Sequence, residues 1–498
     1  MAYSLGIRDA VHLSFILFML VMAALLTERY YLQDEGESLE VSPESLADVE
    51  SETSWYGIYM QEEKIGYSRT TVAKQDTQFI CTDQTYLAFK MVGRMKSVSS
   101  YVRAVTDSRF RLQSFIFTIT GEDTDFGLRG LVDKDVINLN ITVAGESRGE
   151  QIPLEEPPQL PSTVQLLFSS REFKAGDRFS TTVFDPSALS NIKLEVEVVG
   201  RETISYNGED TPVWHIRQQM GGIQVDTFVD EQGRMLEERS GMGYRLVLED
   251  ELEARTGNWP SEGTDIQRLV AVVPDRALPG AREIASLKIE LSGVSQDTLS
   301  LRGGCQSYEE RILDVVPRLP LPGQPADTMP TVIRDVYTSG GSFVQSEHPR
   351  LLALAAEVID LEAPDMEKIR SIMRWMNGNI AKKPTFSIPN TLEVLERKSG
   401  DCNEFAVLFC SLARAAGIPT RIAMGLVYVE DAFYYHAWNE CWLGGWVSVD
   451  PVFGQFPADA THLRFLAGDM DRQIEILPLV GKVGIKVLDY STGPGEAR

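Results

Sequence analysis

The sequence predicts an α+β protein, with an N-terminal membrane helix, a mostly antiparallel β-domain and a C-terminal α+β domain. Three patterns support this prediction: an apolar run near the N-terminus, alternation of apolar and polar residues up to about residue 250, and apolar spacing of three and four beyond residue 340. Alternation with period two is typical of half-buried strands, and the longer spacing is typical of amphipathic helices.

Length and composition indicate a folded protein of several domains. The chain has 498 residues, of which 43% are hydrophobic and 24% are charged, and this balance is ordinary for globular proteins. At about 150 residues per domain, roughly three units are expected. The formal net charge of -25 argues against nucleic-acid binding, because clustered Lys and Arg drive association with phosphates. We therefore expect no nucleic-acid partner.

The N-terminal segment, residues 1–32, is predicted to be a membrane anchor. Its apolar run extends from Ala10 to Leu26, which is at the lower limit of the roughly 17 to 25 residues of a membrane span and longer than a signal-peptide core of about 7 to 15. A cleaved signal peptide is the alternative, and either way the bulk of the chain is exported. Residues 33–53 are acidic, rich in Ser and free of aromatics, so they are predicted to be a disordered tether.

Residues 54–255 are predicted to form the β-rich domain. The clearest strand alternates Ile192, Leu194, Val196 and Val198 with charged residues, and 230–233 reads as a turn between two strands. Residues 256–340 contain many Pro and Gly residues and are predicted to be a connector with some strands, one of them at 286–293.

Residues 341–480 are predicted to be the catalytic domain, and residues 481–498 a C-terminal tail. Apolar spacing predicts helices at 351–359 and 366–380. A third helix is predicted at 401–416, preceded by Gly400 and ended by Gly417 and Pro419.

Cys402 lies in the first turn of this third helix. The unpaired N–H groups and the positive end of the helix dipole stabilise an anion there, so we expect a lowered pKa and a nucleophilic thiolate. Cys410 lies further along the helix beside the apolar stripe and is expected to be inert core. The chain has five cysteines, an odd number, so at least one thiol is unpaired within the chain, and Cys402 is the hypothesis for it.

His436 is the candidate base, and Asp450 is the candidate group that orients it. The sequence around them reads as a strand, a turn with two glycines, and a second strand. A two-residue loop would place Asp450 opposite Asn439 and away from His436. A three-residue loop with positive φ at Gly445 would instead place it opposite Trp438, on the face that carries His436. We predict the second register.

These motifs together resemble the bacterial transglutaminase-like superfamily, which shares a papain-like core. They are the G-x-C at a helix start, the downstream "RAAGIPTR", the tripeptide "HAW", and "GW" leading to Asp450 and Pro451. The resemblance covers roughly 347–466. It implies a Cys402–His436–Asp450 triad and acyl transfer on amides through a thioester, with protein or peptide substrates. Hydrolysis, deamidation and cross-linking stay open.

Each residue also has a plain structural interpretation. Cys402 alone is a small residue near a helix end, His436 alone a core histidine of a strand, and Asp450 a turn residue before proline. His215 and His462 have no partner at ligand-like spacing, so we predict no metal and no cofactor. If the three candidate residues have only these structural roles, the alternative function is a non-catalytic binding or assembly protein that keeps this domain as a scaffold.

Location and partners follow from the anchor and the resemblance together. We expect a single-pass protein of the bacterial inner membrane, with the soluble part in the periplasm or outside the cell. The expected partners are the membrane, through the N-terminal helix, and a protein at the β-domain.

Overall fold

The computed structural model describes residues 37–38 and most of the chain from 51 to 493. Within 51–493 the gaps are 61, 92–93, 122–123, 144–145, 155–157, 160–172, 187–189, 221–222, 242, 257–267, 269, 295–298, 320–328, 342 and 384–389. The predicted span at 10–26 and most of the predicted tether lie outside the described residues. No helix in the described part of the chain is long and apolar enough to cross a membrane.

The N-terminal half is a single 15-stranded sheet, in the order β1-β10-β11-β12-β13-β14-β15-β2-β3-β4-β5-β6-β7-β8-β9. Neighbouring strands are antiparallel except for β1 and β10, so this region is mostly antiparallel, as predicted. Its strands are β1 (Glu37–Ser38), β2 (Glu52–Met60), β3 (Glu63–Gln75), β4 (Gln78–Met91), β5 (Arg94–Thr106), β6 (Leu112–Gly121), β7 (Thr124–Asp133), β8 (Val136–Val143), β9 (Glu146–Pro153), β10 (Arg178–Asp185), β11 (Ser190–Tyr206), β12 (Glu209–Met220), β13 (Ile223–Val229), β14 (Met235–Ser240) and β15 (Tyr244–Glu249).

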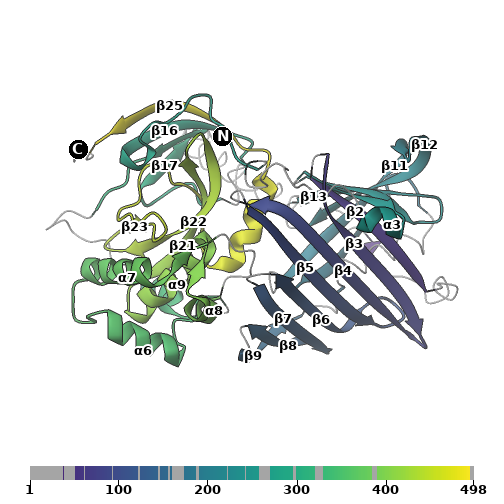
Figure 1. Cartoon of the computed structure of the whole chain (residues 1–498), viewed down its shortest axis with the longest axis horizontal. Helices are drawn as coiled ribbons and strands as arrows, with labels where there is room; N and C mark the ends of the chain where they lie inside the picture. The colour runs from purple at the N-terminus through teal and green to yellow at the C-terminus, as the bar shows by residue number, and fades with distance from the viewer. Residues whose placement is uncertain are drawn as a thin grey trace, which may run out of the picture.

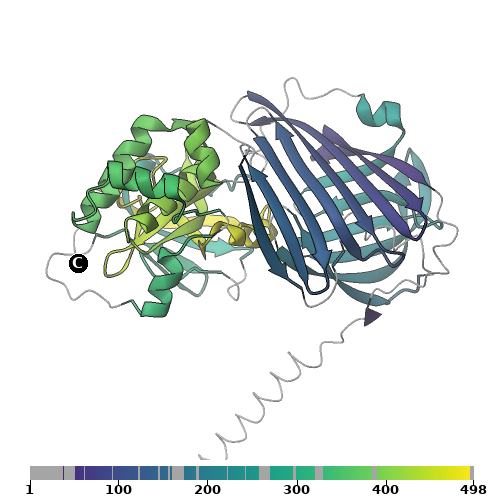
Figure 2. The same ribbon diagram turned by 90° about the horizontal axis from the view of Figure 1, so that it is seen from below.

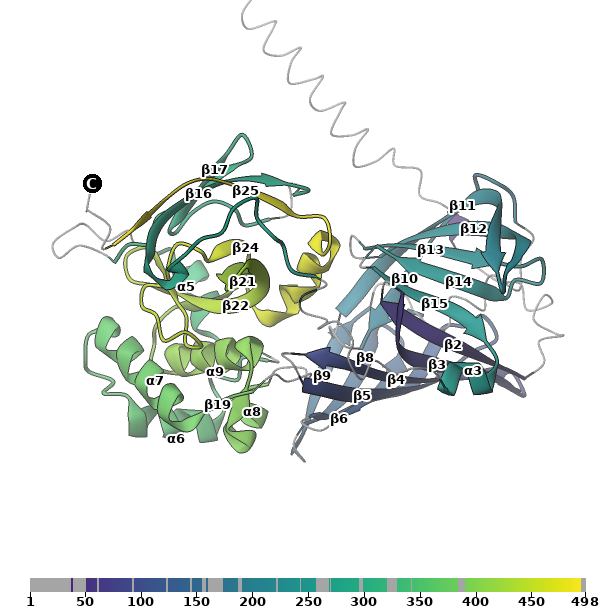
Figure 3. The ribbon, with the colours of Figure 1, turned by 45° about the horizontal axis from the view of Figure 1, so that its top comes forward.

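The sheet curls so that β2–β9 face β10–β15 across a shared core (Figures 2 and 3). Strand β8 shows the cause, because Ile137, Leu139 and Ile141 are buried and alternate with polar residues. The same core receives Phe184 from β10 and Val196 from β11. Alternate residues therefore point to the outside of the curled sheet, where a short helix, α3 (Glu251–Arg255), packs against β2 and β3.

The C-terminal half has three layers, with helices on one side of a sheet and a second sheet on the other (Figures 1 and 3). The central sheet has the order β23-β22-β21-β24. Its strands are β21 (Thr420–Val429), β22 (Ala432–Trp442), β23 (Trp446–Val449) and β24 (Leu463–Gly468). The helices are α5 (Thr331–Thr338), α6 (Pro349–Val358), α7 (Asp365–Asn379), α8 (Thr391–Arg397) and α9 (Cys402–Ala415).

Helix α9 is the centre of the helical layer. Its residues Phe405, Leu408, Phe409 and Leu412 are fully buried, in a cluster that also receives side chains from α6 and α7. The predicted helices at 351–359, 366–380 and 401–416 are therefore present, with ends that differ by a residue or two. Helix α9 is buried on nearly all sides, as expected for a helix that holds a site in place.

The second sheet, in the order β17-β18-β16-β25, joins the predicted connector to the C-terminus. Its strands are β16 (Ile284–Ser292), β17 (Gln306–Glu309), β18 (Ile312–Val315) and β25 (Gly484–Thr492). Strand β25 lies in the segment that we predicted to be a tail, yet it pairs along β16. Alternation in "GIKVLDYST" is weak, and its partner is nearly 200 residues away, so pairing here depends on tertiary contacts.

The remaining elements are short connecting pieces. They are η1 (Ala281–Glu283), η2 (Met470–Leu479), β19 (Ala381–Lys382) and β20 (Ser399–Gly400). Strand β20 leads directly into α9, and η2 contacts β13 of the N-terminal sheet.

Candidate active site

The start of α9 is fixed by a capping box around Asp401. The Asp401 carboxylate accepts from the N–H groups of Asn403 (2.9 Å) and Glu404, while the Glu404 carboxylate accepts from the Asp401 N–H at 3.0 Å. Gly400 is required beside this box, because a Cβ there would lie 2.3 Å from the Cβ of Glu404. Cys402 is consequently the first residue of the helix.

The Cys402 thiol lies against β22. The backbone N–H of Ala437, the residue after His436, points at its sulfur, and Cys402 packs against a buried cluster that includes Ala406 and Ala437. Burial raises the pKa of the thiol well above its ordinary value, and the Asp401 carboxylate adds to this, while the Ala437 N–H acts in the opposite sense. Our expectation of a lowered pKa is therefore wrong for the resting site. The helix dipole lowers the pKa of the Cys402 thiol, but burial and the nearby carboxylates raise this pKa by more.

The hairpin of β22 and β23 has the predicted register. Asn439 pairs with Val449 and Trp442 with Trp446, which leaves a three-residue loop and brings Asp450 onto the face of His436. His436 Nε2 and Asp450 Oδ2 are 2.7 Å apart. One detail differs, because the positive φ of 84° belongs to Gly444 and not to Gly445.

His436 is held in one orientation by a bond and by aromatic neighbours. Since Nε2 is used by Asp450, the Nδ1 atom is the one left to exchange a proton with a thiol. Its ring stacks with Trp438 at a centroid distance of 6.1 Å and contacts Phe453 at 5.3 Å. A ring fixed in this way can act as a base without first being reoriented.

Asp450 is fully buried and fully hydrogen-bonded. Its Oδ1 accepts from the N–H groups of Val452 (2.7 Å) and Phe453 (2.9 Å), and its Oδ2 accepts from both His436 and His462. Burial alone would favour the neutral acid, but the two histidines outweigh it and hold the pKa of Asp450 well below its usual range. The carboxylate therefore stays charged.

His462 was missed by the sequence analysis, although it contacts Asp450 directly. Its Nε2 lies 2.9 Å from Asp450 Oδ2, and its Nδ1 lies 3.1 Å from the carbonyl oxygen of Asp459. Both of these partners are acceptors, so both ring nitrogens must carry hydrogen and the ring is a cation. Burial opposes this, yet Asp450 and Asp459 together raise the pKa of His462 to about 9.

No sequence spacing indicates this contact. His462 follows a long loop after Asp450, with turns and a buried segment between them, and its partner is reached only after the chain folds back. His215, which also seemed to have no partner, contacts Glu202 at 2.8 Å and Asp226 at 2.6 Å within the N-terminal sheet.

His436, Asp450 and His462 bring potential metal-ligand atoms within 4.8 Å of one another. A metal needs a lone pair from each ring nitrogen, and the doubly protonated ring of His462 has none to give. The three side chains therefore fit a hydrogen-bond relay better than a metal centre.

The other cysteines differ from Cys402 in their surroundings. All five are free thiols, so Cys402 is not tied up in a disulfide. Cys410 is fully buried, and burial raises its pKa to about 12, in agreement with the predicted inert core position.

Comparison with known families identifies the domain that contains this site. Residues 352–451 match the model of the Transglutaminase-like superfamily, and the match includes Cys402, His436 and Asp450. This segment is a transglutaminase-like domain. His462 lies beyond the matched residues, so the relay extends past the part of the domain that the family model covers.

Relatives of the transglutaminase-like domain include a protein-glutamine gamma-glutamyltransferase of Pseudomonas aeruginosa, 30% identical over 146 residues. That stretch is 25% of this chain and 21% of the relative, so the chain spans about a fifth of the length of the relative.

Two solved structures are also similar. The periplasmic domain of TgpA from Pseudomonas aeruginosa is 16% identical, with a TM-score of 0.27, over 37% of this chain and 91% of that one. A beta-barrel-like protein of Brucella abortus is 9% identical, with a TM-score of 0.32, over 41% of this chain and 98% of that one. Scores this low do not establish a shared fold.

Proposed function

We propose that this chain is a membrane-anchored, exported cysteine enzyme that hydrolyses or transfers amide acyl groups through Cys402, His436 and Asp450. The observation that carries the proposal is the 2.7 Å bond from His436 to Asp450, which leaves Nδ1 of His436 for the thiol. The position of Cys402 beneath the Ala437 N–H, next to His436 in the chain, supports it. Fold alone would not be enough, because function resides in the site.

The thiol starts neutral, so His436 must remove its proton as the bond forms. Nδ1 of His436 takes the proton while the sulfur attacks a carboxamide carbon, and the ring becomes a cation next to Asp450. The ring then gives this proton to the departing amine, and a thioester remains on Cys402. A water or a primary amine attacks the thioester, His436 takes its proton, and the thiol leaves and is reprotonated. Water completes hydrolysis, whereas an amine completes transamidation.

The oxyanion of the tetrahedral intermediate needs donors that are already in place. The N–H of Cys402 is one, since the capping box engages the next two N–H groups of the first turn. We infer that the Tyr435 hydroxyl is the second. It is buried without a hydrogen-bond partner in the described part of the chain, and it lies on the same side of β22 as Ala437, two residues away.

His462 is assigned a positioning role within this proposal. As a second cation on Asp450, it fixes the carboxylate and shares its negative charge, so Asp450 stabilises a charged His436 less than an unshared carboxylate would.

The substrate class and location come from the resemblance and the relatives. The transferase activity in the name of the Pseudomonas relative favours the side-chain amide of glutamine in a protein or peptide. The apolar run at 10–26 supports an inner-membrane anchor, with the enzyme in the periplasm or outside the cell. A non-catalytic scaffold is the alternative, and the complete hydrogen bonding of Asp450 fits either function, because a buried carboxylate needs such partners in any stable fold.

The test uses the full chain in detergent with a glutamine-containing peptide, with and without a primary amine. We expect ammonia release from the parent, with product masses that show hydrolysis or amine incorporation, and none from Cys402→Ala. Cys305→Ala is the matched control, because Cys305 is also a partly exposed free thiol and it should keep full activity. Equal ammonia release from the parent and Cys402→Ala would refute the enzyme and favour the scaffold.

A further inference from the structure

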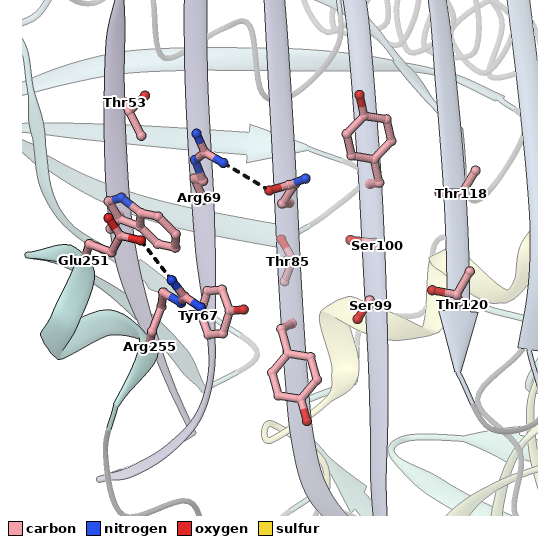
Figure 4. A pocket seen from close by; sticks show the side chains of 14 residues that line it. Thr53, Tyr67, Arg69, Thr85, Ser99, Ser100, Thr118, Thr120, Glu251 and Arg255 are labelled. Atoms are coloured by element: carbon pink, nitrogen blue, oxygen red, sulfur yellow. Dashed lines mark hydrogen bonds and ion pairs between the residues drawn. The ribbon is translucent and has the colours of Figure 1, made fainter.

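The outer face of the N-terminal sheet carries a cavity of about 750 Å³ that no part of the proposed chemistry uses. It lies over strands β2 to β6, with α3 as one wall (Figure 4). Its size is within the range of about 300 to 1,000 Å³ that is usual for ligand sites. The lining residues are Thr53, Trp55, Tyr67, Arg69, Gln84, Thr85, Tyr86, Ser99, Ser100, Tyr101, Thr118, Thr120, Glu251 and Arg255.

Strand register arranges the principal side chains in two neighbouring rows. Directly paired residues of adjacent strands point to the same face of a sheet. The first row follows such pairs across β2 to β6, and it consists of Trp55, Arg69, Gln84, Tyr101 and Thr118. The second row, two residues along, consists of Tyr67, Tyr86, Ser99 and Thr120.

Aromatic rings form a continuous strip through both rows. The ring centroids of Trp55 and Tyr67 are 5.9 Å apart, and those of Tyr67 and Tyr86 are 5.7 Å apart. The Arg69 guanidinium lies 5.4 Å from the Trp55 ring and that of Arg255 lies 5.9 Å from it, which limits the movement of the indole. Successive rings are tilted by 44° and 33°, so the cavity presents a prearranged aromatic strip that bends along its length.

Hydrogen-bonding groups surround the strip. Hydroxyls of Thr and Ser and the amide of Gln84 can each donate and accept. The Nε of Arg69 is buried without a partner in the described part of the chain, so this N–H group can donate a hydrogen bond to an oxygen of a ligand. None of the fourteen residues drawn in Figure 4 has an aliphatic side chain.

These features exclude three ligand classes. An acyl chain needs an aliphatic lining, which is missing. A peptide that adds to a sheet needs a free strand edge, and β2 to β6 each have partners on both sides. Nucleic acid needs many cations, whereas the cavity offers two arginines, one of them paired with Glu251 at 2.9 Å.

We propose that this face binds a glycan strand. The C–H face of a pyranose carries partial positive charge and stacks on the negative face of an aromatic ring, while its hydroxyls point outward to the Ser, Thr and Gln side chains. Arg69 then meets a hydroxyl or carboxylate oxygen of the sugar. The enzyme would be held on a polysaccharide while it acts on protein. The proposal does not depend on the chemistry of Cys402.

The experiment measures binding on the full chain carrying Cys402→Ala, so that catalysis cannot interfere, in a detergent without a sugar headgroup. Short oligosaccharides of glucose, of N-acetylglucosamine and of galacturonic acid are titrated separately by calorimetry. The third arm distinguishes an acidic sugar at Arg69 from a neutral one. A glutamine-containing peptide is titrated as the competing macromolecular class.

We expect saturable binding of at least one oligosaccharide, weakened roughly tenfold by Trp55→Ala, which corresponds to about 1.4 kcal/mol and lies within the range of an aromatic contact. Tyr86→Ala is the second variant if the first does not fold. Trp214→Ala is the matched control, because Trp214 also lies under an arginine, with Arg201 at 4.9 Å, but outside the cavity. No saturation with any sugar, equal weakening by Trp214→Ala, or binding of the peptide alone would overturn the proposal.

Discussion

His462 donates a 2.9 Å hydrogen bond from Nε2 to Oδ2 of Asp450. Because that oxygen also accepts from His436, a single buried carboxylate joins the proposed general base to a ring that stays charged at neutral pH. The candidate site therefore contains a fixed positive charge behind the carboxylate, in addition to the three residues of the proposed triad.

This fixed charge predicts a pH-dependent stability. His462 is buried, and its pKa of about 9 exceeds the unfolded value of about 6.5, so its stabilising effect is complete below pH 6.5 and is lost as pH rises to 9. The free energy of unfolding should fall by up to roughly 3 kcal/mol across this window. Asp450 and Asp459 titrate below it, since their histidine partners outweigh burial and lower both pKa values.

The measurement is urea unfolding of the parent and His462→Gln at several pH values from 6 to 8. Above this range the buried thiols, whose pKa burial raises, would destabilise both proteins as the cysteines of the unfolded chain ionise. The variant should lack the decline, because glutamine cannot take up a proton in this range. If both proteins lose stability in parallel, His462 is not the cation that we describe.

Asp450→Asn tests the orientation of His436. The new Oδ1 can keep the bonds from Val452 and Phe453, so the loop should stay in place. The new amide would set its N–H groups against the N–H of His436 and that of His462. The His436 ring would then prefer the tautomer with hydrogen on Nδ1, which cannot accept a proton from Cys402.

We expect kcat to fall by roughly 10² to 10⁴ with little change in KM, by analogy with orienting carboxylates in other triads. Asp431→Asn is the matched control, since Asp431 is an exposed carboxylate paired with Arg268. A kcat within a few-fold of the parent in Asp450→Asn would remove Asp450 from the mechanism.

The sequence was sufficient for the parts of the site that depend on local rules. The helix start at Cys402 follows from Gly400 and a first-turn motif, and the facing of His436 and Asp450 follows from the length of a hairpin loop. Both are set by neighbours within a few turns of chain, so spacing alone predicts them.

The parts that were missed all depend on distant segments. His462 reaches Asp450 only through an irregular loop, and β25 finds β16 across nearly the whole C-terminal half. The pKa of Cys402 is set by how deeply the thiol is buried, which a helix position does not reveal. Contacts between segments that are far apart in the chain leave no periodic signal in the sequence.

A buried ion cluster next to the site predicts a large loss of stability. Glu440 lies on the same face of β22 as His436 and is paired with Arg464 at 2.6 Å and Arg421 at 2.6 Å, and Arg464 is itself only 1% exposed. Glu440→Gln leaves Arg464 without its counter-charge, which should cost about 3–5 kcal/mol in free energy of unfolding. Urea unfolding checks this. Glu197→Gln, which removes the more exposed ion pairs with Arg178 and Arg217, should change the free energy of unfolding by less than about 1 kcal/mol. Similar small losses in both variants would contradict the prediction.

Tyr435→Phe separates a catalytic hydroxyl from a structural one. Burial raises the pKa of Tyr435 to about 12, so its hydroxyl stays protonated and can donate to an oxyanion. In the resting protein this hydroxyl has no hydrogen-bond partner in the described part of the chain, so its removal should leave stability unchanged or slightly higher. If the hydroxyl is an oxyanion donor, however, its removal should lower kcat roughly 10²-fold and leave KM unchanged.

Steady-state kinetics and urea unfolding of the same preparation give both readouts, with Tyr490→Phe in β25 as the control. Unchanged kcat in Tyr435→Phe would leave the backbone N–H of Cys402 without this second donor and exclude the hydroxyl from the oxyanion site.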